Sequence, residues 1–466
     1  MLFSSITFLY YFLPAVIALY YLAPKCMRNS ILLLSSFFFY GWGEPKYLLL
    51  MLFSIAQAYV FGLLIERYRK EKSSRVFLTA SLVCSLFLLG YFKYADFFLE
   101  SVRSVTGIPV KVLDIALPIG ISFYTFQVIS YVVDVYRGKA SAQKNIVNLA
   151  LYIAMFPQLI AGPIVRYTDI DKQLSSRAHT LSKLAYGVSR LVIGLSKKVL
   201  IANVLYELVQ IYETGQEVTA VMSWIYAIAY TLQVYFDFSG YSDMAIGLGY
   251  IFGFELVENF NYPYISGSIT EFWRRWHMSL GSWFRDYLYI PLGGNRVSKP
   301  RFYLNIFIVW LATGLWHGAA WNFVLWGLIF GVLLVVEKIV GVNKIEEKSV
   351  AGHIYVMFFI IISFVIFGAK SVGAGMTTIA GMLGMGGMEV CSQGTIYYLI
   401  SYAVVLMIAI VGATPLPKIV YKSIKKSKLG ARVVEVIEPI AIGMLLLECT
   451  AYIINGSFNP FLYFRF

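Results

Sequence analysis

The sequence predicts an all-α polytopic membrane protein. Of its 466 residues, 59% are hydrophobic and only 14% are charged, whereas an ordinary soluble domain carries about 25% charged residues. The mean hydropathy is +0.71. The 38 Lys and Arg outnumber the 25 Asp and Glu, and they lie between apolar runs, as in the cytoplasmic loops of membrane proteins. These observations exclude a soluble enzyme, a nucleic-acid-binding protein and a disordered scaffold.

Apolar segments recur along the chain, and a spanning helix needs about 20 mostly apolar residues. The first segment precedes the first cation, Lys25, so we expect a retained helix and not a cleaved signal. Two segments, 31–42 and 302–316, are too short to cross alone. In chain order the candidates lie near 5–23, 31–42, 46–65, 76–95, 113–136, 146–164, 187–211, 219–252, 302–316, 320–338, 352–369, 395–413 and 433–455.

The segment 146–164 is broken by Pro157 and Pro163. Broken helices persist inside a membrane only where protein or a water-filled cavity satisfies the freed backbone groups. Short and interrupted segments therefore predict a thick protein wall around a recess. The chain shows no internal repeat and no soluble stretch, so residues 1–466 are expected to form one membrane domain.

The connecting segments differ in composition. Residues 66–75 and 418–432 are strongly basic and are expected to be cytoplasmic loops. Residues 370–394 are rich in Gly and Met and are expected to form a loop or a short re-entrant piece.

Neither a metal site nor a bound cofactor is expected. The histidines have no cysteine or carboxylate at the spacing of zinc ligands. The four cysteines show no metal or disulfide spacing and are expected to be buried small hydrophobic residues. They are Cys26, Cys84, Cys391 and Cys449.

Polar residues inside apolar segments cost free energy in a membrane and therefore mark candidate functional sites. They are densest between residues 232 and 322. This region opens with Asp237 and Asp243 in an apolar helix. Six residues correspond to about 120° around a helix, so the two carboxylates do not form an acid–base pair. Each is expected to join a hydrogen-bond network or to pair with an arginine.

A helix is predicted to begin at the capping box Ser268-Ile269-Thr270-Glu271 and to continue through Leu280. It would place Trp273 and His277 near one face. The arginines of this region suit a helix at the membrane interface, and they would also suit capture of a phosphorylated donor. They are Arg274, Arg275 and Arg285.

The third polar element is His317, which lies in an apolar segment beside small residues that allow close helix packing. Thr313, His317 and Trp321 would share one helical face. A neutral imidazole in an apolar cavity can take a proton from a hydroxyl. Spacing alone favours a structural histidine and leaves the general-base role open.

At these motifs the sequence resembles the membrane-bound O-acyltransferase family, in its bacterial alginate O-acetyltransferase-like branch. The resemblance covers nearly the whole chain. Its strongest elements are the stretch Tyr235 to Ala245, the stretch Phe272 to Arg296, the stretch Gly314 to Asn322, and the ending Asn459-Pro460-Phe461-Leu462-Tyr463-Phe464-Arg465-Phe466. The family implies a ring of about 11–13 transmembrane and re-entrant helices around a thinned centre with a funnel or tunnel.

The resemblance also implies residue roles. The family's essential histidine matches His317, and its second polar position matches His277. The catalytic region would then be residues 232–322, with Asp237 and Asp243 as a supporting polar network. The candidates for binding the donor or substrate are Arg274, Arg275, Arg285, Trp273, Trp316 and Asn322.

The activity implied by this branch is O-acetylation of an extracytoplasmic polysaccharide. The donor would be acyl-coenzyme A, expected to be acetyl-coenzyme A, or an acyl-carrier thioester. The implied partners are an extracytoplasmic SGNH-type acetyltransferase or a small membrane protein. The expected location is the bacterial inner membrane.

Two alternatives stay open. The D-alanyl transfer protein of teichoic acid modification shares the pattern Phe272-Trp273-x-Arg275-Trp276-His277-Met278-Ser279, whereas Tyr289 to Arg296 and the Asn459–Phe466 ending favour the acetyltransferase branch. A transporter or a non-catalytic membrane scaffold would also carry many spans with polar residues at their centre. The lack of an inverted repeat argues against a transporter.

The basic loops give a prediction of topology. In a cysteine-free background, single cysteines placed at 66–75 or at 418–432 should react with an impermeant thiol reagent only after the cytoplasmic side is opened. Labelling of both positions in intact cells would reverse the orientation of the chain.

Overall fold

The computed structural model describes residues 1–160, 162–341 and 349–456. All of its regular elements in these ranges are helices, and none is a strand. Six helices are long and apolar enough to cross a membrane, so the prediction of an all-α polytopic membrane protein is confirmed. They are α3 (Pro45–Arg67), α4 (Lys72–Thr106), α15 (Trp321–Val340), α16 (Val350–Gly368), α18 (Gln393–Gly412) and α20 (Lys428–Asn455).

The described chain divides into two compact units, one formed by Met1–Leu191 with Ser242–Glu258 and one formed by Val192–Tyr241 with Asn259–Phe466. The boundaries fall inside α9 (Leu181–Ser196) and α11 (Ala220–Ile251). The single domain over residues 1–466, and the ring with a funnel, remain predictions.

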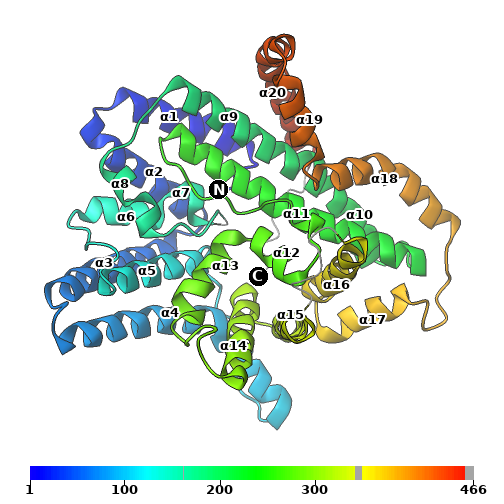
Figure 1. The fold of residues 1–466 in the computed structure, drawn as a ribbon, viewed down its shortest axis with the longest axis horizontal. Helices are drawn as coiled ribbons and strands as arrows, with labels where there is room; N and C mark the ends of the chain where they lie inside the picture. Colours follow the sequence, from blue (N-terminus) through cyan, green and yellow to red (C-terminus); the bar gives the residue numbers. More distant parts are fainter. Residues whose placement is uncertain (161, 342–348, 457–466) are drawn as a thin grey trace. The chain divides into compact units, whose positions relative to one another are not determined.

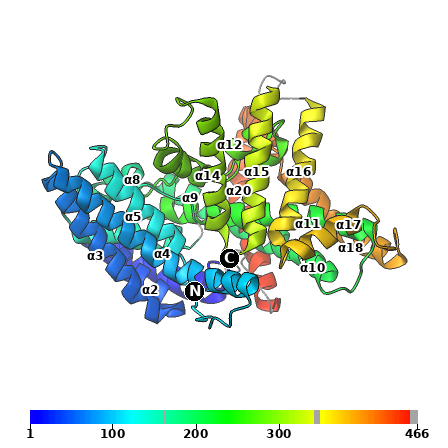
Figure 2. The same cartoon turned by 90° about the horizontal axis from the view of Figure 1, so that it is seen from below.

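The first unit is built on α3, α4 and α5 (Ile121–Tyr136), which pack side by side (Figure 2). Gln57 of α3 donates to Ser85 of α4 at 3.0 Å and accepts from Ser81 at 3.0 Å, so these polar groups satisfy one another between two spanning helices. The remaining helices of this unit are η1 (Thr7–Phe12), α1 (Leu13–Leu22), η2 (Lys25–Met27), α2 (Arg28–Gly43), α6 (Ile146–Ala154), α7 (Phe156–Leu159) and α8 (Tyr167–Ser175).

The break predicted in segment 146–164 is present. Helix α6 ends at Ala154 and the short α7 carries Pro157 in its first turn, where a proline is tolerated because that N–H has no partner within the helix. Residue 161 of this stretch lies outside the described residues.

The second unit carries α14 (Lys299–His317) and α15 as its most extensively packed pair, and α15 packs in turn against α16 (Figures 1 and 2). Its other helices are η3 (Lys197–Ala202), α10 (Asn203–Glu213), η4 (Pro263–Ile265), α12 (Ile269–Arg275), α13 (Met278–Phe284), η5 (Arg285–Tyr289), α17 (Val372–Met382), α18, α19 (Leu416–Lys425) and α20.

Glycines allow α14 and α15 to approach closely. A Cβ on Gly314 would collide with the carbonyl of Phe323, and a Cβ on Gly327 would collide with the carbonyl of Trp310. The predicted close approach at the small residues of this segment is therefore confirmed.

Several expectations are wrong in detail. The basic segment 418–432 is largely helical, because it contains α19 and the start of α20. Cys26 and Cys391 are exposed, and only Cys449 is fully buried. Thr313 and His317 do not share a helical face with Trp321, because α14 ends at His317 and α15 begins at Trp321. The Asn459–Phe466 ending lies outside the described residues.

The α14–α15 contact gives a prediction of stability. Gly314→Ala should destabilise the protein by about 1–3 kcal/mol, because the new Cβ overpacks the contact. Gly443→Ala in α20 is the matched control, since a Cβ there meets nothing within 4 Å. Thermal unfolding in detergent measures both, and equal midpoints for the two variants would contradict the close contact.

Candidate active site

The candidate site begins where the chain breaks between α12 and α13. Ser268 caps α12 as predicted, accepting from the Glu271 backbone N–H at 3.0 Å. The prediction that this helix continues to Leu280 is wrong, because α12 ends at Arg275 and His277 has a φ of +44°. Few non-glycine residues adopt this left-handed conformation, and it is enriched at functional sites.

The break is held by backbone pairing with an extended segment. The Met278 N–H donates to the Asn259 carbonyl at 2.9 Å, and the Asn261 N–H donates to the Arg275 carbonyl at 2.9 Å. Because the segment starting at Asn259 satisfies backbone groups on both sides of His277, the helix cannot continue through this residue.

The His277 imidazole is buried, with 1% of the residue exposed. Its Nδ1 lies 3.1 Å from Oδ1 of Asn259, and its Nε2 has no hydrogen-bond partner among the described residues. Burial and then the charge of nearby His317 hold the pKa of His277 well below its ordinary value. Both effects favour the neutral form of the ring.

His317, the last residue of α14, lies in an aromatic enclosure. Its ring centroid is 5.0 Å from Trp316, 5.0 Å from Trp326 and 5.3 Å from Phe367. The Trp316 ring is also 5.8 Å from the His277 ring. The fold thus brings the two predicted histidines together, with Trp316 packed against both.

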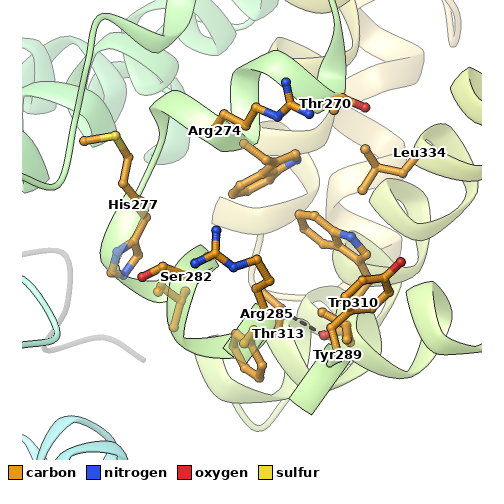
Figure 3. Close-up of a pocket in the computed structure, with 15 residues that line it drawn as sticks. Thr270, Arg274, His277, Ser282, Arg285, Tyr289, Trp310, Thr313 and Leu334 are labelled. Atoms are coloured by element: carbon orange, nitrogen blue, oxygen red, sulfur yellow. Dashed lines mark hydrogen bonds between the residues drawn. The ribbon is translucent and has the colours of Figure 1, made fainter. Parts of the chain in front are cut away.

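A cavity of about 620 Å³ opens beside His277 (Figure 3). Its lining comes from α12, α13, η5, α14 and α15 and is mostly apolar. His317 is not part of the lining, although Thr313, one turn earlier on α14, is. The lining residues are Thr270, Trp273, Arg274, His277, Met278, Leu280, Gly281, Ser282, Phe284, Arg285, Tyr289, Val309, Trp310, Thr313 and Leu334.

A second cavity, of about 410 Å³, shares five residues with the first. The shared residues are Thr270, Tyr289, Val309, Trp310 and Leu334. The second cavity is also lined by Lys338 and Asn295. The two cavities therefore adjoin, and the combined space has cations along its border.

The three predicted arginines differ in what they contact. Arg274 and Arg285 line the first cavity, and Figure 3 shows the Arg285 side chain reaching into its middle. Arg285 bonds Asp286 at 2.7 Å, which raises the pKa of the guanidinium. Arg274 is exposed and makes no ion pair within the described residues. Arg275 instead bonds Glu271 at 2.8 Å and the Asn261 carbonyl at 3.2 Å.

The other predicted binding residues also divide. Trp273 lines the cavity, with its ring 4.6 Å from Trp310. Asn322, in the first turn of α15, donates from its side-chain amide to two carbonyls at the end of α16. They are those of Phe367 at 3.2 Å and Ala369 at 3.0 Å. Asn322 thus supports the segment that carries Phe367 beside His317.

The two carboxylates of α11 are both paired, Asp243 with an arginine, as predicted, and Asp237 with a lysine. Asp243 bonds Arg190 at 2.6 Å within the first unit. Asp237 bonds Lys198 at 2.6 Å within the second unit, where Lys198 comes from the π-helical turn η3. Lys198 and Asp237 are both almost fully buried, so each neutralises a charge that the interior would otherwise reject.

Sequence reasoning missed several residues of the site. Asn259 lies in an irregular segment with no motif to indicate its contact with His277. Trp310 and Leu334 look like ordinary apolar residues of spanning helices, and only the packing of α14 against α15 places them at the cavity. No group of three potential metal ligands occurs in the part of the chain that the structure describes.

Apolar spanning helices, with the buried imidazole of His277 at a cavity bordered by arginines, define an integral-membrane protein with a candidate active site. Residues 138–372 match the model of the membrane-bound O-acyltransferase family. The chain is 45% identical to a probable alginate O-acetylase of Pseudomonas aeruginosa, over 80% of this chain and 72% of the relative. The chain therefore belongs to the membrane-bound O-acyltransferase family and is an O-acyltransferase.

Two further relatives extend the comparison. A peptidoglycan O-acetyltransferase of Helicobacter pylori is 33% identical over 84% of this chain and 81% of its own length. A teichoic acid D-alanyltransferase of Bacillus subtilis is 30% identical over 46% of this chain and 58% of its own length.

Proposed function

We propose that this O-acyltransferase moves an acetyl group from a cytoplasmic thioester donor across the inner membrane, for O-acetylation of an extracytoplasmic polysaccharide. The observation that carries the proposal is the cavity beside His277, bordered by Arg274, which has no carboxylate partner within the described residues. The polysaccharide-acetylating relatives align over most of the chain, whereas the D-alanyltransferase aligns over 46% of it. This difference favours acetyl over D-alanyl transfer.

The donor would be acetyl-coenzyme A or an acyl-carrier thioester, both of which end in a phosphate-bearing arm. Arg274, Arg285 and Lys338 would bind the phosphates at the border of the two adjoining cavities. The apolar wall around Trp273 and Trp310 would cover the thioester end and exclude water.

Only the acyl group needs to cross. The charged donor would lose its hydration in hydrocarbon, at a cost that binding could not offset. A neutral acetyl group carries no such penalty. Cytoplasmic binding of the donor and an extracytoplasmic acceptor are therefore compatible in one enzyme.

In the proposed reaction His317 takes the proton of the acceptor hydroxyl while the oxygen attacks the thioester carbonyl. A C–O bond forms, the C–S bond breaks, and the leaving thiolate takes the proton from His317, which returns to its neutral form. His277 contacts the thioester end of the donor from the lining of the cavity. An extracytoplasmic SGNH-type acetyltransferase, or a small membrane partner, would supply the accepting hydroxyl and pass the acetyl group to the polymer.

The two neighbouring arginines give a matched test of donor binding. Arg274→Gln should raise the KM for acetyl-coenzyme A about 10-fold with normal folding, because it removes one charge-assisted contact. Arg275→Gln should leave this KM unchanged and lower the yield of folded protein, because it breaks the contacts with Glu271 and Asn261. The reverse pattern would move the donor away from this cavity.

The general-base role of His317 predicts a loss of rate. His317→Gln should lower acetyl transfer about 10²–10⁴-fold, because glutamine keeps hydrogen-bonding capacity but cannot take the proton. The control is His353→Gln, an exposed histidine of α16, which should retain wild-type activity. Thiol release from acetyl-coenzyme A by protein in vesicles measures both, and near-normal transfer by His317→Gln would leave His317 a structural residue.

A further inference from the structure

One side-chain oxygen organises the donor side of the site. Oδ1 of Asn259 lies 3.1 Å from Nδ1 of His277 and accepts from the Ser279 hydroxyl at 2.8 Å and from the Ser279 backbone N–H at 3.3 Å. Asn259 is only 1% exposed. All of these groups belong to one compact unit of the chain.

These contacts determine which ring nitrogen carries the proton. A backbone N–H can only donate, so the Asn259 atom facing Ser279 is the amide oxygen and not the nitrogen. The same oxygen faces Nδ1 of His277, which must therefore donate. In a neutral imidazole the other nitrogen, Nε2, then carries the lone pair.

The plane of the ring is fixed separately. The Phe238 ring packs edge-on against His277 at 4.6 Å, and Trp316 lies 5.8 Å away. The titratable or charged groups around this ring are His317, which interacts with it electrostatically, and Arg274, Arg285 and Tyr289, which line the same cavity. Within the described residues none of these groups hydrogen-bonds Nδ1, so the tautomer depends on Asn259.

We propose that Asn259 is a positioning residue that holds His277 as the Nδ1–H tautomer, so that Nε2 accepts a hydrogen bond from an N–H of the thioester donor. The inference rests on the proposed function only in naming the donor as the ligand of Nε2. Coenzyme A and acyl-carrier arms both carry amide N–H groups near the thioester, and such a group needs an acceptor once water is excluded. In the Nε2–H tautomer, the ring N–H of His277 would face the amide N–H of the donor, and no hydrogen bond could form between them.

The tautomer can be measured without any turnover. The full chain, labelled with ¹⁵N-histidine and placed in lipid nanodiscs, should give one resonance set with the Nδ1–H signature that disappears in His277→Gln. In Asn259→Ala the His277 signature should change to Nε2–H, because Nδ1 has lost its acceptor. Asn259→Asp supplies an equivalent oxygen and should keep the Nδ1–H form.

Kinetics test the consequence for the donor. Asn259→Ala should raise the KM for acetyl-coenzyme A about 10-fold with a smaller change in kcat. The variant keeps the backbone bond from Met278 to residue 259, so the turn is expected to persist. The matched control is Asn261→Ala, an exposed neighbour that pairs with Arg275 through backbone atoms, which the substitution keeps, and this variant should behave as wild type.

The pH profile separates positioning from a general structural role. In Asn259→Asp the carboxylate favours the imidazolium, which raises the pKa of His277. Protonated Nε2 no longer accepts, so the acid limb of kcat/KM for the donor should move to higher pH than in the wild type. A variant that was merely destabilised would lose activity without moving this limb.

An Nε2–H signature in the wild type, or an unchanged signature and KM in Asn259→Ala, would overturn the positioning role. Wild-type protein that neither binds nor cleaves acetyl-coenzyme A, while His277 shows the Nδ1–H signature, would overturn the donor assignment and leave the role of Asn259 in setting the tautomer supported.

Discussion

A polar or charged group inside hydrocarbon must find its partner within the protein, and most of this structure follows from that constraint. It explains why Gln57 bonds Ser81 and Ser85 between spanning helices. It also explains why Asp237 is matched by Lys198, although the two residues lie in different helical elements. Each such pair fixes the rotation of one helix against another, so the polar contacts set the register that apolar packing leaves open.

The candidate active site differs from these pairs, because two of its polar groups have no partner among the described residues. Arg275 and Arg190 have carboxylate partners, whereas Arg274 borders a cavity with no ion pair in the described part of the chain. His277 is buried, yet its Nε2 meets no described partner. A cation and an acceptor that both lack a described partner beside one cavity support this cavity as the place of a ligand.

Sequence reasoning located several spanning helices because the length of an apolar run corresponds to the length of the helix that crosses the membrane. Segments 46–65, 320–338 and 352–369 correspond to α3, α15 and α16 within a few residues at each end. It failed where tertiary contacts override local pattern. The capping box at Ser268 is a local signal and was predictable, but the helix stops at Arg275 because a segment 14 or more residues earlier supplies the competing hydrogen bonds. Both histidines could be predicted as candidates, but the role of Asn259 could not, since no spacing rule relates an irregular segment to a later turn.

The positions of the two histidines bear on how an acyl group could change sides. His277 lines the 620 Å³ cavity, and His317 lies outside its lining, within an enclosure of Trp316, Trp326 and Phe367. Trp316 packs against both rings. In the proposed reaction the acceptor hydroxyl attacks the thioester carbonyl directly, so both molecules would have to meet near the two rings that Trp316 contacts. The two histidines need not be equivalent in that reaction. His277 would bind the molecule that gives up the acyl group, and His317 would take the proton of the molecule that receives it.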